Sequence, residues 1–173
     1  MIVFDSSTLV LLAKTEMLDM FLNDFKGDVV IPRSVEREVT IKGTFDALLL
    51  KKRIEEGKIK IKSVKDDNAN KFMQDFNINI GEAESICLAM GGEDSILATD
   101  DKKAITACKL LGINFTNAPN ILIRFREKML LTEEQAGEKL NLLIKNGRYK
   151  KEITEVVKTR LKEVGKNAKN SKH

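Results

Sequence analysis

Acidic side chains stand where apolar runs of this sequence end or where helical runs begin, namely at Asp5, Glu38, Glu82, Asp100 and Asp101. Histidine, another common metal ligand and general base, occurs only as the last residue of the chain. A site built from oxygen ligands without histidine suits Mg²⁺ or Mn²⁺. Such an ion polarises a phosphoryl oxygen and lowers the pKa of a bound water. The residue types therefore predict a divalent-metal site for the hydrolysis of a phosphodiester, provided that the fold brings the acids together.

Two of these positions follow predicted strands. The apolar run of residues 1–4 leads directly to Asp5, and residues 95–99 form a similar run before the pair Asp100 and Asp101. Helix-forming residues come next in both places. In an open parallel sheet, the carboxyl ends of neighbouring strands face one crevice. We therefore expect these acids to be neighbours in space.

The other two positions lie on predicted helices. Val35 and Val39 are four residues apart and mark the buried stripe of one helix, on which Glu38 lies beside Val35. Glu82 follows Gly81 in the first turn of a strongly apolar helix. Both side chains are thus candidates to face the same crevice.

Each acid taken singly also has a purely structural explanation. An aspartate between a strand and a helix is a good N-cap, and acids in a first turn favour the helix dipole. On position alone, Glu38 is equally well explained as a solvated helix residue. Capping by itself does not require so many acids, and this favours the metal site.

The stretches IVFDSSTLVLLAK, VVIPRSVEREV, GEAESICLAMGG and ILATDDKKAITACKLLG, which lie within residues 2–112, carry these acids. Together they resemble the PIN domains, a family that includes the VapC-like toxins of toxin–antitoxin pairs. The resemblance implies that Asp5, Glu38, Glu82 and Asp100 form an acidic cluster with Asp101 beside it. It implies a Mg²⁺- or Mn²⁺-dependent ribonuclease with Asp5, Glu82 and Asp100 as metal ligands.

The resemblance favours Glu82 over Glu84, because in many family members the helix acid stands eighteen residues before the strand-end aspartate, as Glu82 does before Asp100. Glutamate here departs from the aspartate often found in the family, and Glu84 remains an alternative that could share the site. Beyond residue 112, NAPNILIRFREKMLLT and the NGRY turn resemble a less characterised PIN-like branch.

Strands and helices are expected to alternate along the chain. Strands are predicted near residues 2–4, 28–31, 59–62, 95–98 and 113–115. Helical segments separate them, including one that contains Leu48, Leu49 and Leu50 as core residues. This alternation predicts a three-layer α/β/α fold with a central parallel sheet of about five strands, followed by C-terminal helices.

One domain accounts for 173 residues of which 42% are hydrophobic. We expect a catalytic part at 1–130, a helical extension packed on it at 131–165 and a disordered basic tail at 166–173. No apolar run reaches the length of a membrane span, so a cytoplasmic protein is expected. Cys87 and Cys108 lack zinc-site spacing and are expected to be buried thiols.

The C-terminal part is strongly basic. Residues 145–173 contain ten Lys or Arg and three Glu, whereas the net charge of the whole chain is +4. These cations could attract a phosphate backbone, although for the last residues a solvated, frayed end is the simpler interpretation. Thr132 and Gln135 predict a capping box for the helix that Gly147 ends.

Two other classes of protein remain open. A phosphoacceptor receiver domain also carries acids at strand ends, but its acid pair usually follows the first strand, where this chain has only Asp5. A catalytically inactive module of the same fold could bind RNA or a protein through its basic helices. For the nuclease, the expected partners are an RNA substrate, an antitoxin protein and a second copy of the chain in a homodimer.

Overall fold

Five short parallel strands form the centre of the computed structural model, which describes residues 1–64 and 68–170, with side chains up to residue 164. The strands are β1 (Ile2–Phe4), β2 (Val29–Pro32), β3 (Lys60–Lys62), β4 (Ile96–Ala98) and β5 (Asn114–Thr116). Their order is β3-β2-β1-β4-β5, so the direction of winding reverses between β1 and β4. The predicted five-stranded parallel sheet is confirmed.

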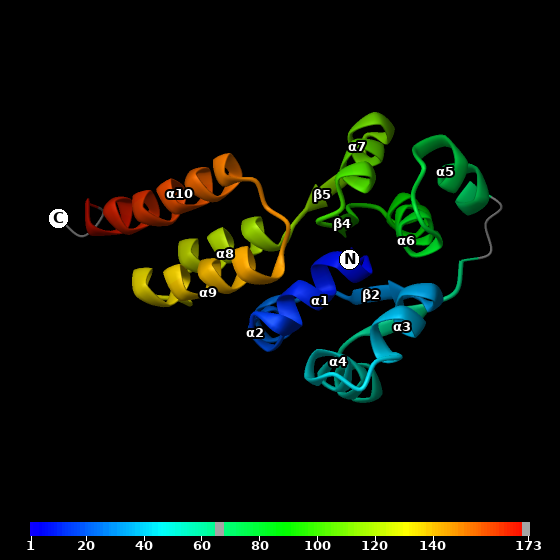
Figure 1. The fold of residues 1–173 in the computed structure, drawn as a ribbon, viewed down its shortest axis with the longest axis horizontal. Coiled ribbons are helices and arrows are strands. Elements are labelled where there is room, and N and C mark those ends of the chain that lie inside the picture. Colours follow the sequence, from blue (N-terminus) through cyan, green and yellow to red (C-terminus); the bar gives the residue numbers. More distant parts are fainter. Residues whose placement is uncertain (65–67, 171–173) are drawn as a thin grey trace.

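Helices pack on both faces of this sheet (Figure 1). They are α1 (Ser6–Lys14), α2 (Leu18–Asp24), α3 (Arg33–Thr40), α4 (Phe45–Glu55), α5 (Asn68–Phe76), α6 (Ile80–Met90), α7 (Lys102–Leu111), α8 (Ala118–Glu127), α9 (Glu133–Asn146) and α10 (Lys151–Asn170). The predicted three-layer α/β/α architecture with additional C-terminal helices is therefore confirmed.

The alternation of side chains along each strand divides the core between the two faces. Ile2 and Phe4 of β1 belong to a large cluster with α1, α2, α3 and the C-terminal helices. Val3, which points the other way, belongs to a smaller cluster with α5, α6 and α7. Phe4 is paired in register with Ala98. The residues that directly follow β1 and β4 consequently emerge side by side.

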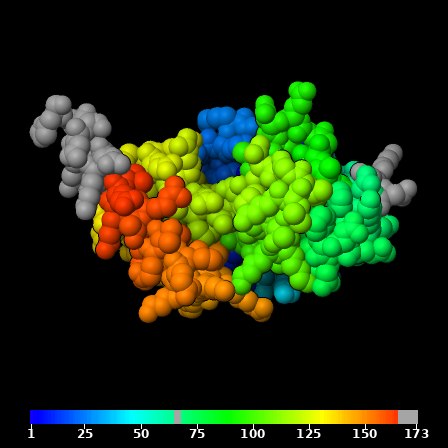
Figure 2. All heavy atoms as spheres, turned by 90° about the horizontal axis from the view of Figure 1, so that it is seen from above, coloured from blue at the N-terminus to red at the C-terminus, as the bar shows by residue number. Residues whose placement is uncertain are grey.

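The C-terminal helices share the larger of these two clusters. Leu140 and Leu143 of α9 and Leu161 of α10 are buried together with Leu9 of α1. In Figure 2, the orange surface of α10 lies directly against the yellow-green surface of the α7 to α8 region. The capping box of Thr132 and Gln135 is present as predicted. This part of the chain therefore packs on the same body that holds the sheet.

The leucines of α4 and the two cysteines are residues whose burial the sequence predicts. The three leucines of α4 do not share one environment, because Leu50 is fully buried whereas Leu48 is 59% exposed. Consecutive helix positions point in different directions, so a run of three cannot all face the core. The expectation for Leu48 is wrong. Cys87 and Cys108 are free and buried, as predicted.

The predicted tail at 166–173 falls partly on α10, which is helical to Asn170, and partly on residues 171–173, which lie outside the described residues. None of the helices in the described part of the chain combines the length and the hydropathy that a membrane span requires.

Candidate metal centre

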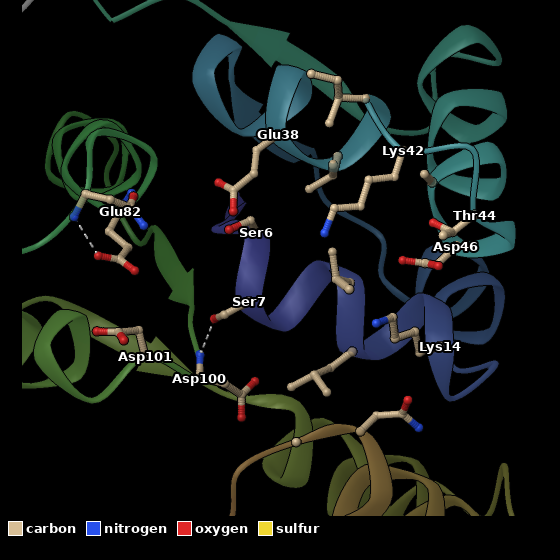
Figure 3. Close-up of a pocket in the computed structure, with 18 of the residues that line it drawn as sticks. Ser6, Ser7, Lys14, Glu38, Lys42, Thr44, Asp46, Glu82, Asp100 and Asp101 are labelled. Atoms are coloured by element: carbon tan, nitrogen blue, oxygen red, sulfur yellow. Dashed lines mark hydrogen bonds between the residues drawn. The ribbon is translucent and has the colours of Figure 1, made fainter.

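A cavity of about 950 Å³ opens beside the carboxyl ends of β1 and β4 (Figure 3). Its walls come from α1, α3, the start of α4, the starts of α6 and α7, and the turn between α9 and α10. Glu38, Glu82, Asp100 and Asp101 line it. Four of the five acids predicted from the sequence therefore face one space, at the point where the order of the strands reverses. This is where ligands bind in open α/β sheets.

Asp5 lies behind the wall of the cavity and not on it. Its side chain is 1% exposed and caps α1 by accepting a hydrogen bond from the backbone N–H of Thr8 (3.1 Å). The hydroxyl of Ser7 donates to Oδ1 (2.7 Å), and the hydroxyl of Thr99 donates to Oδ2. The capping role that the sequence allows for Asp5 is thus present.

Burial raises the pKa of Asp5 from 3.8 to about 7. The hydrogen bonds from Thr99, Ser7 and Thr8 favour the charged form and oppose this shift, while the negative charge of Asp100 adds to it. Asp5 is joined to Asp100 through Ser7, whose hydroxyl also accepts a hydrogen bond from the backbone N–H of Asp100 (2.9 Å, drawn in Figure 3). The two aspartates are therefore mechanically and electrostatically linked.

Asp100 is held from three directions. Its Oδ2 accepts hydrogen bonds from the hydroxyl of Thr8 (2.7 Å) and from the backbone N–H of Ala118 (3.0 Å). Its Oδ1 accepts one from the hydroxyl of Tyr149 (2.6 Å). Residues from α1, α8 and the turn before α10 thus fix one carboxylate at the edge of the cavity.

Tyr149 is a site residue that sequence reasoning missed. Burial raises the pKa of its hydroxyl, and the negative charge of Asp100 raises it further, so the hydroxyl remains a proton donor. The available signal was weak, because Tyr149 is the only tyrosine of the chain and lies in the NGRY turn. Nothing in the residue order shows that this turn returns to the end of β4.

Asp101 caps α7. Its Oδ1 accepts hydrogen bonds from the backbone N–H groups of Lys103 (2.8 Å) and Ala104 (2.9 Å). The other oxygen accepts no hydrogen bond within the described structure, and Asp101 lines the cavity. The structural and the functional explanations of this residue are therefore compatible.

Glu82 likewise combines two roles. It forms a capping box with Asn79, in which each side chain accepts a hydrogen bond from the backbone N–H of the other at 2.9 Å. Partial burial raises the pKa of Glu82, and the negative charges of Asp101 and Glu38 raise it further. Carboxylates that share a cavity without a cation are expected to repel one another in this way.

Glu38 lies close to Gly81 at the start of α6. A Cβ placed on Gly81 would lie 3.5 Å from Oε2 of Glu38 and 3.2 Å from Val35. Glu84 points elsewhere, since it accepts a hydrogen bond from the hydroxyl of Ser34 and is not among the residues that line the cavity. Glu82 therefore lines the cavity, whereas Glu84 does not.

The donor set fits a divalent metal in its chemistry. Oδ2 of Asp101 and Oε1 of Glu82 accept no hydrogen bond in the described structure, and Oδ1 of Asp100 accepts only one, so each has a free lone pair. In the positions observed, however, no three His, Cys, Asp or Glu side chains of the described residues are close enough to hold one ion. For three of these acids to share one ion, side chains would have to turn, and those of Glu38 and Glu82, on α3 and α6, could turn toward Asp100.

The other part of the cavity is basic, which sequence reasoning also missed. Lys14, Arg37, Lys42 and Arg148 line it together with Asp46. The cations come from α1, from α3 and the segment that follows it, and from the turn after α9, so they are scattered in sequence and gave no local cluster of charge.

Comparison with known proteins agrees with this geometry. The PIN domain family DUF3368 matches residues 1–166, which include α8, α9, most of α10 and Tyr149. No curated protein and no solved structure gives a significant match. PIN domains are typically metal-dependent nucleases, and four of the five acids expected from that chemistry line one cavity here. The chain belongs to the PIN domain family.

Proposed function

We propose that the protein is a Mg²⁺- or Mn²⁺-dependent ribonuclease that hydrolyses phosphodiester bonds of RNA. The observation that carries the proposal is the convergence of Glu38, Glu82, Asp100 and Asp101 on one cavity at the carboxyl ends of β1 and β4. These acids come from three separate segments, α3, α6 and the junction of β4 and α7, and a receiver domain would instead gather its acids after the first strand.

Asp100 and Asp5 would form the fixed side of the metal site. Asp100 is immobilised by Thr8, Ala118 and Tyr149, and Asp5 supports it from behind through Ser7. Glu38 and Glu82 would form the adjustable side, because longer side chains on facing helices can complete the ligand shell or orient a water. A divalent ion held there polarises the phosphoryl oxygen and lowers the pKa of its bound water.

The proposal is tested by cleavage of a mixed pool of labelled RNAs with Mn²⁺, with Mg²⁺ and with EDTA. Wild-type protein should cut only with metal. Asp100→Asn and Glu82→Gln should each lose on the order of 100-fold in kcat, since even residues behind a metal's ligands contribute 10–100-fold. Glu84→Gln is the matched control, because Glu84 lies on the same helix outside the cavity. It should retain activity.

Absence of cleavage in every condition, with RNA still retained in a binding assay, would contradict the proposal and indicate an inactive binding module. Equal losses in the Glu82 and Glu84 variants would contradict the assignment of the site to Glu82 alone. A toxin role, as in VapC-like proteins, adds one requirement: expression of wild-type protein should arrest growth, and Asp100→Asn should relieve the arrest.

A further inference from the structure

The cavity has two chemically different ends. Glu38, Glu82, Asp100 and Asp101 form the acidic end. Beyond Ser6 and Ser7, the ammonium groups of Lys14 and Lys42 point into the space above α1 (Figure 3). A metal site accounts for the acids and leaves these cations unexplained.

The basic side chains of the cavity are not neutralised by the protein. Within the described part of the chain, Lys14, Lys42 and Arg148 form no ion pair or side-chain hydrogen bond, and all three are exposed. Some cations elsewhere in the molecule are paired, as Lys139 is with Glu16 (2.7 Å) and Lys128 with Asp24 (2.7 Å). Cations left unpaired in a cavity remain available to an anionic ligand.

Arg148 is held at the cavity by the contact that fixes Asp100. Tyr149, the next residue, donates its hydroxyl to Asp100 (2.6 Å). On the other side, Gly147 packs so closely on the Tyr149 ring that a Cβ would overlap it. The turn that carries Arg148 is therefore anchored to the end of β4.

The size and lining of the cavity indicate what kind of anion it can hold. Its volume of about 950 Å³ lies at the upper end of the range of roughly 300–1,000 Å³ for small-molecule pockets, so it exceeds the needs of a single ion. No aromatic side chain is among the described residues that line it, so bases have no surface to stack on. A nucleic acid in this cavity would therefore contact the lining side chains mainly through its phosphates.

We propose that Lys14, Lys42 and Arg148 form a subsite that binds the phosphodiester backbone of a single RNA strand beside the bond to be cut. The subsite rests on the proposed ribonuclease function and adds the residues that hold the strand. It acts on phosphates alone, so it contributes affinity without sequence preference. Asp46, the acid that lines the same region, opposes phosphate binding.

The experiment measures the affinity of labelled single-stranded RNAs of one length and different sequences, in EDTA and again with Ca²⁺, over a series of salt concentrations. Lys14→Ala, Lys42→Ala and Arg148→Ala should each weaken binding roughly three- to tenfold and reduce the slope of log K against log salt by about 0.7. The loss should be the same for every sequence. Asp46→Asn should strengthen binding.

The matched control is Lys150→Ala, an exposed lysine of the same turn that does not line the cavity. It should leave the salt slope unchanged. Equal losses in the control and the cavity variants would overturn the subsite in favour of general charge attraction. Absence of wild-type RNA binding in both EDTA and Ca²⁺ would overturn it as well.

Cleavage assays keep this inference separate from the proposed function. In an active protein, the three variants should raise KM and retain kcat at saturating RNA. If wild-type protein cuts RNA and the variants behave like it, the subsite is wrong and the ribonuclease stands. If wild-type protein never cuts, while the variants lose affinity as described, the subsite stands and the ribonuclease is wrong.

Discussion

A buried carboxyl group with a raised pKa makes the stability of a protein depend on pH. Asp5 has a pKa of about 7 in the folded protein, against 3.8 as its ordinary value. The folded state thus binds the proton more tightly, and the resulting stabilisation is complete below pH 3.8 and is lost as the pH rises through 7. A divalent ion near Asp5 and Asp100 would compensate the charge that appears at higher pH.

For metal-free protein, we expect the free energy of unfolding attributable to Asp5 to fall by roughly 3 kcal/mol between pH 5 and pH 8. Urea denaturation at several pH values measures it, and Asp5→Asn supplies the comparison because it cannot ionise. The difference between the two proteins should follow this pH dependence. An equally steep curve for Asp5→Asn would show that another group is responsible.

Tyr149 allows a second prediction at the level of single residues. Tyr149→Phe removes the hydrogen bond to Oδ1 of Asp100 and should destabilise the protein by roughly 1.5–3 kcal/mol, as expected for a hydrogen bond to a charged group. Without this donor, Asp100 loses one of the groups that fix its carboxylate at the edge of the cavity. In folded protein, Tyr149→Phe should therefore lower kcat for metal-dependent cleavage by about 10-fold, which a loss of stability alone would not cause. An unchanged kcat would exclude a positioning role.

Helix starts are the elements that carry most of this site, since Asp5, Glu82 and Asp101 each cap or brace the helix that follows. Capping fixes the side chain close to its own backbone and aims it at the carboxyl edge of the sheet. The same hydrogen bonds that stabilise the helix therefore place the acid. This explains why structural and functional interpretations of these residues do not exclude each other.

Glu82 lets the two roles be separated by experiment. Glutamine can also serve in a capping box, so Glu82→Gln should change the free energy of unfolding by less than about 0.5 kcal/mol, whereas Glu82→Ala should cost about 1 kcal/mol. Both variants lack the charge, and both should lose metal-dependent cleavage. Calorimetry measures the stability of each variant, and the cleavage assay measures its activity. If Glu82→Gln kept both its stability and its cleavage activity while Glu82→Ala lost both, the separation of the two roles would be contradicted.

For the whole molecule, the C-terminal helices matter both for the core and for the site. Leu143 of α9 is fully buried in the cluster that also contains Leu9 and Phe4. The turn after α9 brings Tyr149 to Asp100. Stability and site geometry are thus expected to depend on the same segment.

Leu143→Ala should destabilise the protein by about 2–5 kcal/mol, as large-to-small changes in a core do. Lys145→Ala, an exposed position on the same helix, should have little effect.

A chain ending at residue 130 should fail to fold cooperatively, because it would expose the apolar surface that α9 and α10 cover. Circular dichroism and urea denaturation measure the stability of the Leu143 variant and of the truncated chain. A stable, cooperative 1–130 fragment would show that the extension is dispensable.

Local sequence patterns determined the elements of this protein and the types of its acidic residues. Strand lengths, capping residues and buried stripes depend on near neighbours in the chain, which is why the five strands and the capping box at Thr132 could be predicted. General rules for parallel sheets predicted that the acids after the first and fourth strands would be neighbours, and the pairing of β1 with β4 in the structure agrees with this.

Only the tertiary structure decided which side chains meet and how exposed they are. It placed Asp5 behind the cavity wall, brought Tyr149 to Asp100 across forty-nine residues, and gathered Lys14, Lys42 and Arg148 from three segments. Such contacts depend on how helices pack and on where a distant turn returns. No periodicity or spacing along the chain records those distances, because they arise when the whole core is packed.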